Sequence, residues 1–99
     1  MKLKELVAYQ TGAVVSRTLV SVKGGTVTAF AFDEGQELSE HTAPYDAMAI
    51  VLEGEVHIKI SGAYSHLKEG DTIIMPANKP HALKAVTKFK MMLIMVKAR

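Results

Sequence analysis

A histidine precedes an apolar run in the stretch His41-Thr-Ala-Pro-Tyr-Asp-Ala-Met-Ala-Ile-Val-Leu-Glu-Gly-Glu55. The order is reversed in a second stretch, Gly70-Asp-Thr-Ile-Ile-Met-Pro-Ala-Asn-Lys-Pro-His81, where the glycine comes first and the histidine last. Short apolar runs bounded by glycine and proline are typical of β-strands. The two stretches therefore predict two strands, each with a histidine near one end.

The remainder of the chain repeats this short-strand pattern, and no segment shows helical periodicity. Two adjacent glycines, Gly24 and Gly25, predict a tight hairpin between the first two strands. Residues 2–9 alternate weakly and are compatible with an edge strand or with a short helical turn. We expect strands over residues 17–22, 26–32, 38–42, 47–52, 55–60, 65–67, 72–75, 81–86 and 89–96. Short strands at such regular spacing predict an all-β fold, a closed or sandwiched antiparallel barrel.

Length and composition limit the number of domains and the kinds of chemistry that the chain can support. Ninety-nine residues, 48% of them hydrophobic, make one domain over residues 1–99, with 1–15 as an N-terminal edge segment and 16–97 as the barrel. The chain has no cysteine, which excludes disulfides, thiol catalysis and cysteine-bound zinc. The sequence also has no phosphate-binding loop and no nucleophile elbow.

The glycine, proline and histidine spacings resemble the two motifs of the cupins, a family of small β-barrels. Gly35, His41 and Gly54 fall on the spacing of the first motif, whereas Ala43 and Ala47 stand where its second histidine and its glutamate belong. In the second motif the matching residues are Gly70, Pro76 and His81, while Asn78 replaces a glycine and Ala85 an asparagine. The resemblance implies a cupin-type antiparallel β-barrel, also described as a jelly roll or double-stranded β-helix.

In cupins the positions of His41 and His81 face the barrel interior and hold a divalent metal ion together with two further ligands. Here both further positions are alanine, which cannot ligate. The resemblance thus leaves two interpretations open. The first is one weakly held Fe, Mn, Ni or Zn ion. The second is no metal and two neutral histidines hydrogen-bonded to each other, to water or to a bound organic molecule. In either case two histidines in an apolar interior need polar partners.

Other candidate residues surround this pair. Tyr45 and Met48 follow His41 closely, and Met91 belongs to a methionine-rich final strand, so we expect all three to border a ligand cavity. His57 alternates out of phase with its apolar neighbours, and His66 lies near a turn, so both are expected on the surface. Asn78 is expected in the left-handed backbone conformation that the glycine of the motif would adopt.

Several of the expected strands are apolar on both faces, notably residues 26–32, 47–52 and 89–96. A single small barrel buries one face of each strand, so we expect a homodimer to cover the other. The net charge of +2 and the absence of aromatic residues among the C-terminal lysines, Phe89 excepted, argue against a nucleic-acid partner. No apolar run is long enough for a membrane helix, and a disulfide-free chain without an apolar leader favours the cytoplasm.

These observations rank three functions. The first is a barrel that binds a small organic molecule through apolar walls and His41 and His81. The second is a metal-dependent enzyme that resembles cupin dioxygenases, isomerases or decarboxylases. A purely structural or interaction module ranks last, because such a barrel has no need of two inward histidines. Whether the chain is an enzyme stays undecided at this point.

Overall fold

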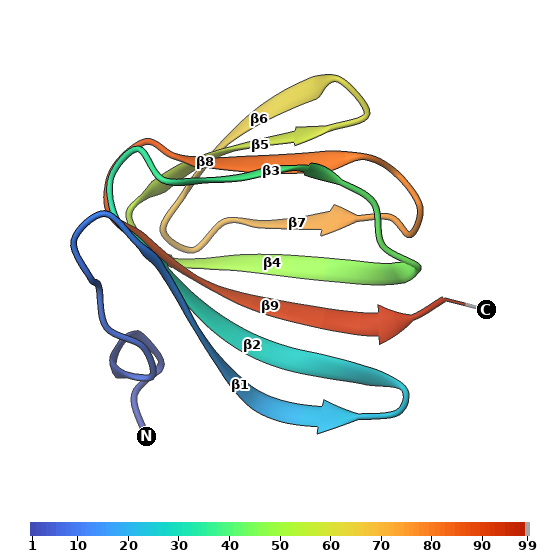
Figure 1. Cartoon of the computed structure of the whole chain (residues 1–99), viewed down its shortest axis with the longest axis horizontal. Coiled ribbons are helices and arrows are strands. Elements are labelled where there is room, and N and C mark those ends of the chain that lie inside the picture. The colour runs from blue at the N-terminus through green and yellow to red at the C-terminus, as the bar shows by residue number, and fades with distance from the viewer. Residues whose placement is uncertain (99) are drawn as a thin grey trace.

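The computed structural model of the chain describes residues 1–98, and almost all of its regular structure is β-strand (Figure 1). One short 3₁₀ helix, η1, spans Leu3–Glu5. The nine strands are β1 (Val14–Val22), β2 (Gly25–Phe32), β3 (Glu37–His41), β4 (Tyr45–Glu53), β5 (Glu55–Ile60), β6 (Ala63–Lys68), β7 (Thr72–Met75), β8 (His81–Ala85) and β9 (Phe89–Lys97).

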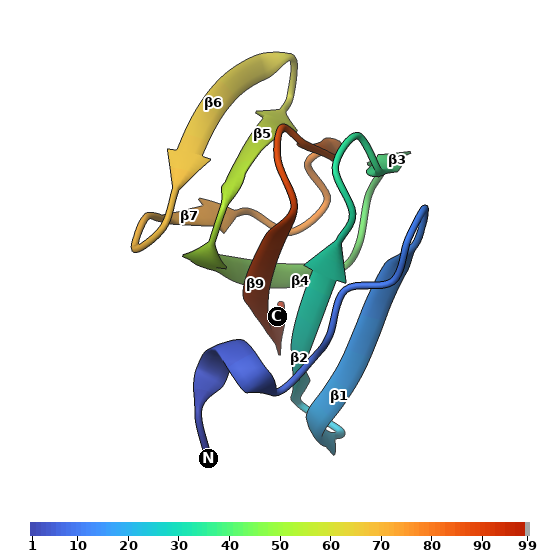
Figure 2. The ribbon, with the colours of Figure 1, turned by 90° about the vertical axis from the view of Figure 1, so that its left-hand side faces the viewer.

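The strands form two antiparallel sheets that face each other (Figure 2). The larger sheet has the strand order β1-β2-β9-β4-β7, and the smaller has the order β3-β8-β5-β6. Consecutive strands often belong to opposite sheets, as expected of a jelly-roll barrel. The predicted all-β barrel is therefore confirmed.

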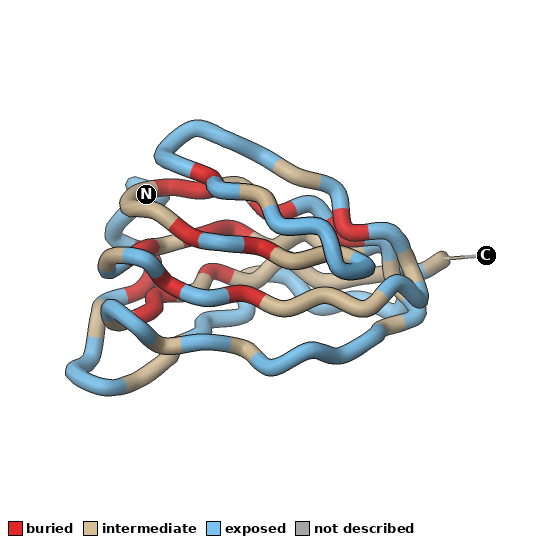
Figure 3. Tube along the Cα trace, turned by 90° about the horizontal axis from the view of Figure 1, so that it is seen from above, coloured by how far each residue is buried: buried red, intermediate tan, exposed pale blue. Residues whose placement is uncertain are grey.

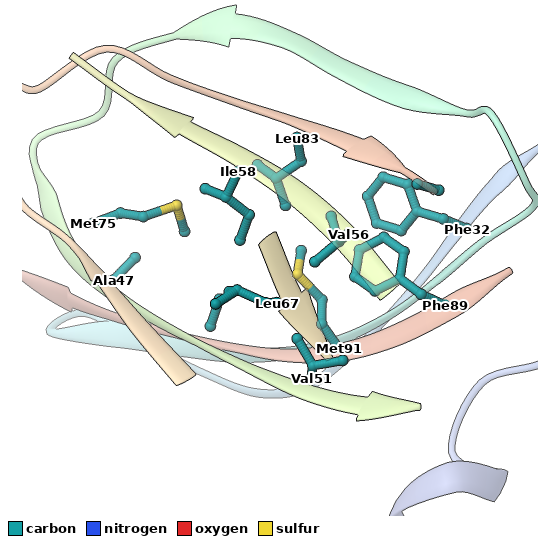
Figure 4. Close-up of a cluster of buried hydrophobic side chains, with 12 residues drawn as sticks. Phe32, Ala47, Val51, Val56, Ile58, Leu67, Met75, Leu83, Phe89 and Met91 are labelled. Carbon is teal, nitrogen blue, oxygen red and sulfur yellow. The ribbon is translucent and has the colours of Figure 1, made fainter. Parts of the chain in front are cut away.

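The interior between the two sheets is filled by one face of each strand (Figure 4). On β2 the side chains alternate between the two faces of the sheet: Phe30 and Phe32 point into this core, whereas Ala29 and Ala31 point out of it. Phe32 stacks on Phe89 with ring centroids 4.6 Å apart. The fully buried large side chains are Phe32, Phe89, Ile58, Met91, Val51 and Val56.

A second apolar cluster lies on the outer face of the larger sheet, and the N-terminal segment covers it. This segment is not an edge strand: η1 leads into Leu6 and Val7, which are 5% and 6% exposed and pack with Leu52 and Met92. The N-terminal segment therefore covers part of the outer face of the larger sheet within the same chain. Figure 3 shows buried positions alternating with exposed ones along the trace.

The expected left-handed conformation of Asn78 is confirmed, with a φ of 64°. The backbone N–H of Asn78 donates a hydrogen bond to the carbonyl of Ala43 at 2.8 Å. This bond ties the loop between β7 and β8 to the loop between β3 and β4 at one end of the barrel (Figure 1).

Among residues 1–98, no helix has the length and hydropathy needed to cross a lipid bilayer.

Candidate functional site

His41 and His81 meet at the end of the barrel where these two loops are joined. They are cross-strand partners, His41 at the end of β3 and His81 at the start of β8. Their ring centroids are 4.3 Å apart, and the ring planes meet at 67°. The chain thus brings together two residues that are far apart in sequence, as the two motifs predict.

A β-bulge turns His41 into the barrel. Leu38 pairs with Leu83, and the next partners along the ladder are His41 and His81. Between these two pairs β3 advances three residues while β8 advances only two, so one residue of β3 is extra. In a regular strand, residues three apart lie on opposite faces. The extra residue in the bulge shifts the alternation by one position. His41 therefore lies on the same inward face as Leu38.

Each imidazole is fixed by a hydrogen bond to a carbonyl two residues earlier in its own chain segment. The Nδ1 atom of His41 lies 2.7 Å from the carbonyl oxygen of Ser39, and Nδ1 of His81 lies 3.2 Å from that of Lys79. A carbonyl oxygen only accepts hydrogen bonds, so Nδ1 is the protonated nitrogen in both rings. When the rings are neutral, each Nε2 therefore keeps its lone pair and is an acceptor or a metal ligand.

The surroundings of His81 favour its neutral form. Burial lowers the pKa of His81 below its usual value, the bond to the Lys79 carbonyl acts in the opposite direction, and the neighbouring His41 lowers the pKa further. At neutral pH this ring is thus an acceptor through Nε2, not a cation.

The inward faces of β2 and β4 carry small residues toward the histidine end of the barrel. Beyond Phe30, the inward positions of β2 are occupied by Thr28 and Thr26. The inward positions of β4 in the same cross-strand rows are Ala49 and Ala47. These small residues share their cross-strand rows with the larger Leu93 and Met95 of β9.

The histidines lie nearer to solvent than the sequence led us to expect. His41 is exposed and His81 is half-buried, so the pair stands at the mouth of the barrel and not deep within hydrocarbon. The physical reason is position along the strands, since His41 is the last residue of β3 and His81 the first of β8. The site is therefore accessible from outside.

The three other expected cavity residues have different positions. Tyr45 is half-buried and shares the inward face of β4 with Ala47, so it lies at the mouth on the histidine side. Met91 is 1% exposed and packs in the central core, where it fills space away from the mouth. Met48 is on the wrong face: it lies one residue from the inward Ala47, is 37% exposed, and points outward from the larger sheet.

Thr26 is a mouth residue that the sequence reasoning did not single out. Its Oγ1 atom is buried and has no hydrogen-bond partner within residues 1–98. It faces inward from β2, in the same cross-strand row as Met95 and Ala47. The alternation of β2, continued two residues beyond Thr28, would have placed it there.

The mouth offers two histidine ligands, fewer than the protein ligands that a catalytic metal centre usually has. Such centres generally use three protein ligands, and the alanines at positions 43 and 47 supply none. Within residues 1–98, no group of three or more histidine, aspartate and glutamate side chains is arranged to hold a metal ion. The residues present thus do not fit the metal set that cupins usually carry.

A second pair of histidines lies on the outer surface, as expected for both members. His57 and His66 are cross-strand partners on β5 and β6, with ring centroids 4.9 Å apart. Both are exposed, and Nε2 of His66 lies 2.9 Å from a carboxylate oxygen of Glu55. This pair resembles the mouth pair in geometry but faces away from the barrel interior.

Known structures share this architecture closely. A conserved protein of unknown function from Streptococcus pyogenes has 40% identity and a TM-score of 0.95, over 100% of this chain and 87% of that one. A Cupin 2 conserved barrel domain protein from Leptotrichia buccalis is also 40% identical, with a TM-score of 0.95. This chain spans 98% of its own length but 47% of that protein.

A cupin superfamily protein from Desulfitobacterium hafniense has 26% identity and a TM-score of 0.95, over 99% of this chain and 90% of that one. No protein with a curated description matches the chain. Residues 28–97 match the family described as the cupin domain. This match covers more than half of the sequence and includes both histidine-bearing stretches, so the chain belongs to the cupin family.

Proposed function

We propose that this cupin binds a small organic molecule at the mouth of its barrel, between apolar walls and the imidazoles of His41 and His81. The observation that carries the proposal is the fixed orientation of the two rings. Both Nδ1 atoms are engaged by carbonyls of the same chain, which leaves one lone-pair nitrogen on each of two rings whose centroids are 4.3 Å apart. Ligand sites of this kind combine apolar surface with a few fixed polar groups.

The hydrogen-bonding groups of the site determine which kind of ligand it favours. Two acceptor nitrogens favour a molecule with hydroxyl or N–H donors over a carboxylate, which only accepts. The unpartnered hydroxyl of Thr26 adds a further polar group on the opposite sheet. The neighbouring Ala47, Met75 and Met95 supply apolar contacts for the remainder of the ligand. A neutral molecule with an apolar body and a polar, donor-bearing end meets these requirements.

Native mass spectrometry of the protein as purified tests this proposal. We expect a bound molecule on the wild type that is lost from the double variant His41→Phe/His81→Phe. The double variant His57→Phe/His66→Phe provides a matched control, because it removes the other cross-strand histidine pair without touching the mouth. Retention of the same molecule by the mouth variant, or its loss from the outer-pair variant alone, would contradict the proposal. Protein without any bound molecule would then be titrated with neutral polyols and phenols, and no binding by any of them would also contradict it.

The competing function is a metal-dependent enzyme. One observation favours it: histidines that bind metals usually donate their second ring N–H to a carbonyl or carboxylate, as both rings do here. Elemental analysis of protein made without a histidine tag separates the two functions. Near-stoichiometric Fe, Mn, Ni or Zn that disappears in the His41/His81 variant and persists in the His57/His66 variant would establish the metal site. Our proposal predicts no such metal.

A further inference from the structure

The outer face of the smaller sheet carries a hollow of about 380 Å³, a volume within the range of small-molecule sites. It lies over β3, β8 and β5, which are neighbours in that sheet (Figure 1), and Tyr64 of β6 borders it. Its central residue, Ala82, alternates along β8 with Leu83, which belongs to the core, so the hollow faces away from the barrel interior. It is therefore separate from the mouth of the barrel.

The small side chain of Ala82 keeps this hollow open. The cross-strand partner of Ala82 on β5 is Lys59, and the bulge of β3 places Glu40 on its other side. A carboxylate oxygen of Glu40 lies 3.8 Å from Nζ of Lys59, so this ion pair spans β8 at a residue that has only a methyl group. A larger side chain at position 82 would occupy the space between them.

Charged side chains line the hollow with opposite signs on opposite sides. The two carboxylates, Glu37 and Glu40, belong to β3, whereas the two ammonium groups, Lys59 and Lys84, belong to β5 and β8. The imidazole of His57 completes the polar lining. Because the formal charges of the four ionic groups cancel, the lining favours neither an anion nor a cation. It is complementary to a molecule that carries one charge of each sign.

Glu37 and Lys84 are the two charges best placed to bind such a molecule. They are cross-strand partners, and within residues 1–98 neither forms an ion pair, whereas Glu40 and Lys59 are joined to each other. Neighbouring strands lie about 4.8 Å apart, a separation that the ammonium and carboxylate of one α-amino acid can bridge. The ammonium group would donate hydrogen bonds to Glu37, and the carboxylate would accept them from Lys84.

The remainder of the hollow suits an aromatic side chain. Ala82 contributes a methyl group at the floor, and Tyr64 contributes a ring that is 72% exposed. Lys59 lies between these two residues, with Nζ 5.6 Å from the centre of the Tyr64 ring, and its aliphatic stem adds further apolar surface. An aromatic ring packs favourably against another ring at such a site.

We propose that this hollow binds a free aromatic α-amino acid. Its ammonium group contacts Glu37, its carboxylate contacts Lys84, and its side chain extends over Ala82 toward β6. This site differs from the mouth in position and in ligand, because neither His41 nor His81 belongs to its lining and its ligand is a zwitterion. The two sites are therefore independent, and failure of one proposal leaves the other standing.

NMR titration of the isotope-labelled protein with L-phenylalanine tests the site. We expect saturable shift changes at the backbone amides around the hollow. N-acetyl-L-phenylalanine lacks the ammonium group and L-phenylalaninamide lacks the carboxylate, so each should bind about 10-fold more weakly, the effect of one lost hydrogen bond to a charged group. Equal binding of the three compounds, or no saturable change with L-phenylalanine, would overturn the proposal. Tighter binding of inorganic phosphate than of L-phenylalanine would indicate an anion site and would also overturn it.

Substitutions in the lining locate the bound amino acid. Glu37→Gln and Lys84→Met should each raise the dissociation constant for L-phenylalanine by about 10-fold. Lys68→Met is the matched control and should leave the constant unchanged, because Lys68 is exposed on the same face of the sheet but lies outside the lining. Ala82→Leu fills the hollow without changing a charge and should prevent binding. Wild-type affinity in the Glu37 and Lys84 variants, or an equal loss in Lys68→Met, would contradict the proposal.

The mouth variant His41→Phe/His81→Phe distinguishes this site from the proposed site at the mouth. It should bind L-phenylalanine with the affinity of the wild type. Loss of this binding in the mouth variant, together with normal binding in Lys84→Met, would assign the amino acid to the mouth and overturn the outer site. Circular dichroism verifies that each variant is folded, and Ala82→Val is a second filling variant should Ala82→Leu not fold.

Discussion

His41 and His81 face each other across the β3–β8 ladder with ring centroids 4.3 Å apart, and each ring is anchored through Nδ1 to a carbonyl of its own segment. The anchors hold two lone-pair nitrogens at the mouth of the barrel without help from a third side chain. Protonation of His81 would remove its acceptor and set a positive charge beside the ring of His41, whose proximity lowers the pKa of His81.

Stability should consequently fall in mildly acidic solution. Burial lowers the pKa of His81 in the folded state, so below the ordinary histidine pKa of about 6.5 the unfolded chain binds more protons. The contribution of His81 is fully present above that pH and is lost as the pH falls toward the folded-state pKa. We expect the free energy of unfolding in urea to drop less between pH 7 and pH 5 for His81→Gln than for the wild type. Because the ring is only partly buried, the difference should stay below about 1.4 kcal/mol, the equivalent of one pKa unit. Equal drops for both proteins would contradict the expectation.

Gly54 should be the most sensitive of the turn glycines. Gly54 and Gly35 both have a φ of 80°, so alanine at either position meets the same backbone strain, about 1–2 kcal/mol. A Cβ at Gly54 would also lie 2.1 Å from the carbonyl oxygen of Lys88 and 2.8 Å from Cα of Phe89, whereas at Gly35 it meets nothing within 4 Å. Gly54→Ala should therefore destabilise the protein by several kcal/mol more than Gly35→Ala in denaturant unfolding. Similar losses would show that the loop carrying Lys88 moves away at little cost.

The N-terminal segment should contribute to stability through its buried side chains, and Leu6 tests this contribution on its own. Leu6 is 5% exposed against the outer face of the larger sheet, while Leu3, in the same segment, is 55% exposed. We expect Leu6→Ala to cost about 2–5 kcal/mol in denaturant unfolding and Leu3→Ala less than about 0.5 kcal/mol. Equal effects of the two substitutions would mean that the segment is not docked in solution.

Tyr9 reports on the same docking through its titration. Its hydroxyl donates a 2.6 Å hydrogen bond to a carboxylate oxygen of Glu53, and burial together with this bond raises the pKa of Tyr9 well above its usual value of about 10. In an absorbance titration of the phenolates, one of the three tyrosines should ionise late. Tyr9→Phe should remove that late step and cost about 1 kcal/mol of stability. A wild type whose tyrosines all ionise near pH 10 would contradict the placement.

The elements that could be predicted from the sequence are those set by local patterns. Strand β5 alternates cleanly between apolar and polar residues and has the expected bounds, as does β7, which lies between a glycine turn and a proline. The meeting of His41 and His81 was implied by the resemblance to the cupin motifs, in which the matching positions face the barrel interior. Asn78 took its left-handed conformation because asparagine is the commonest residue other than glycine to adopt it.

The features that escaped prediction depend on partners distant in sequence. Met48 belongs to a strand that is apolar on both faces, so alternation alone does not say which face is inward. The inward orientation of His41 depends on a bulge in the pairing of β3 with β8. The residues of β3 do not predict this bulge. The docking of Leu6 depends on an outer face that exists only once the larger sheet has formed.

The position of β9 also has a consequence for how the molecule is made. It is the last of the nine strands in chain order, yet it is the middle strand of the larger sheet, with β2 on one side and β4 on the other. During synthesis the first eight strands are made before the one that joins β2 to β4. Such non-local pairing is slow, because the chain must lose the entropy of closing a long loop before the strands can form favourable contacts. Until residues 89–97 pair, β2 and β4 each keep an open strand edge, so the larger sheet is completed only by the end of this sequence.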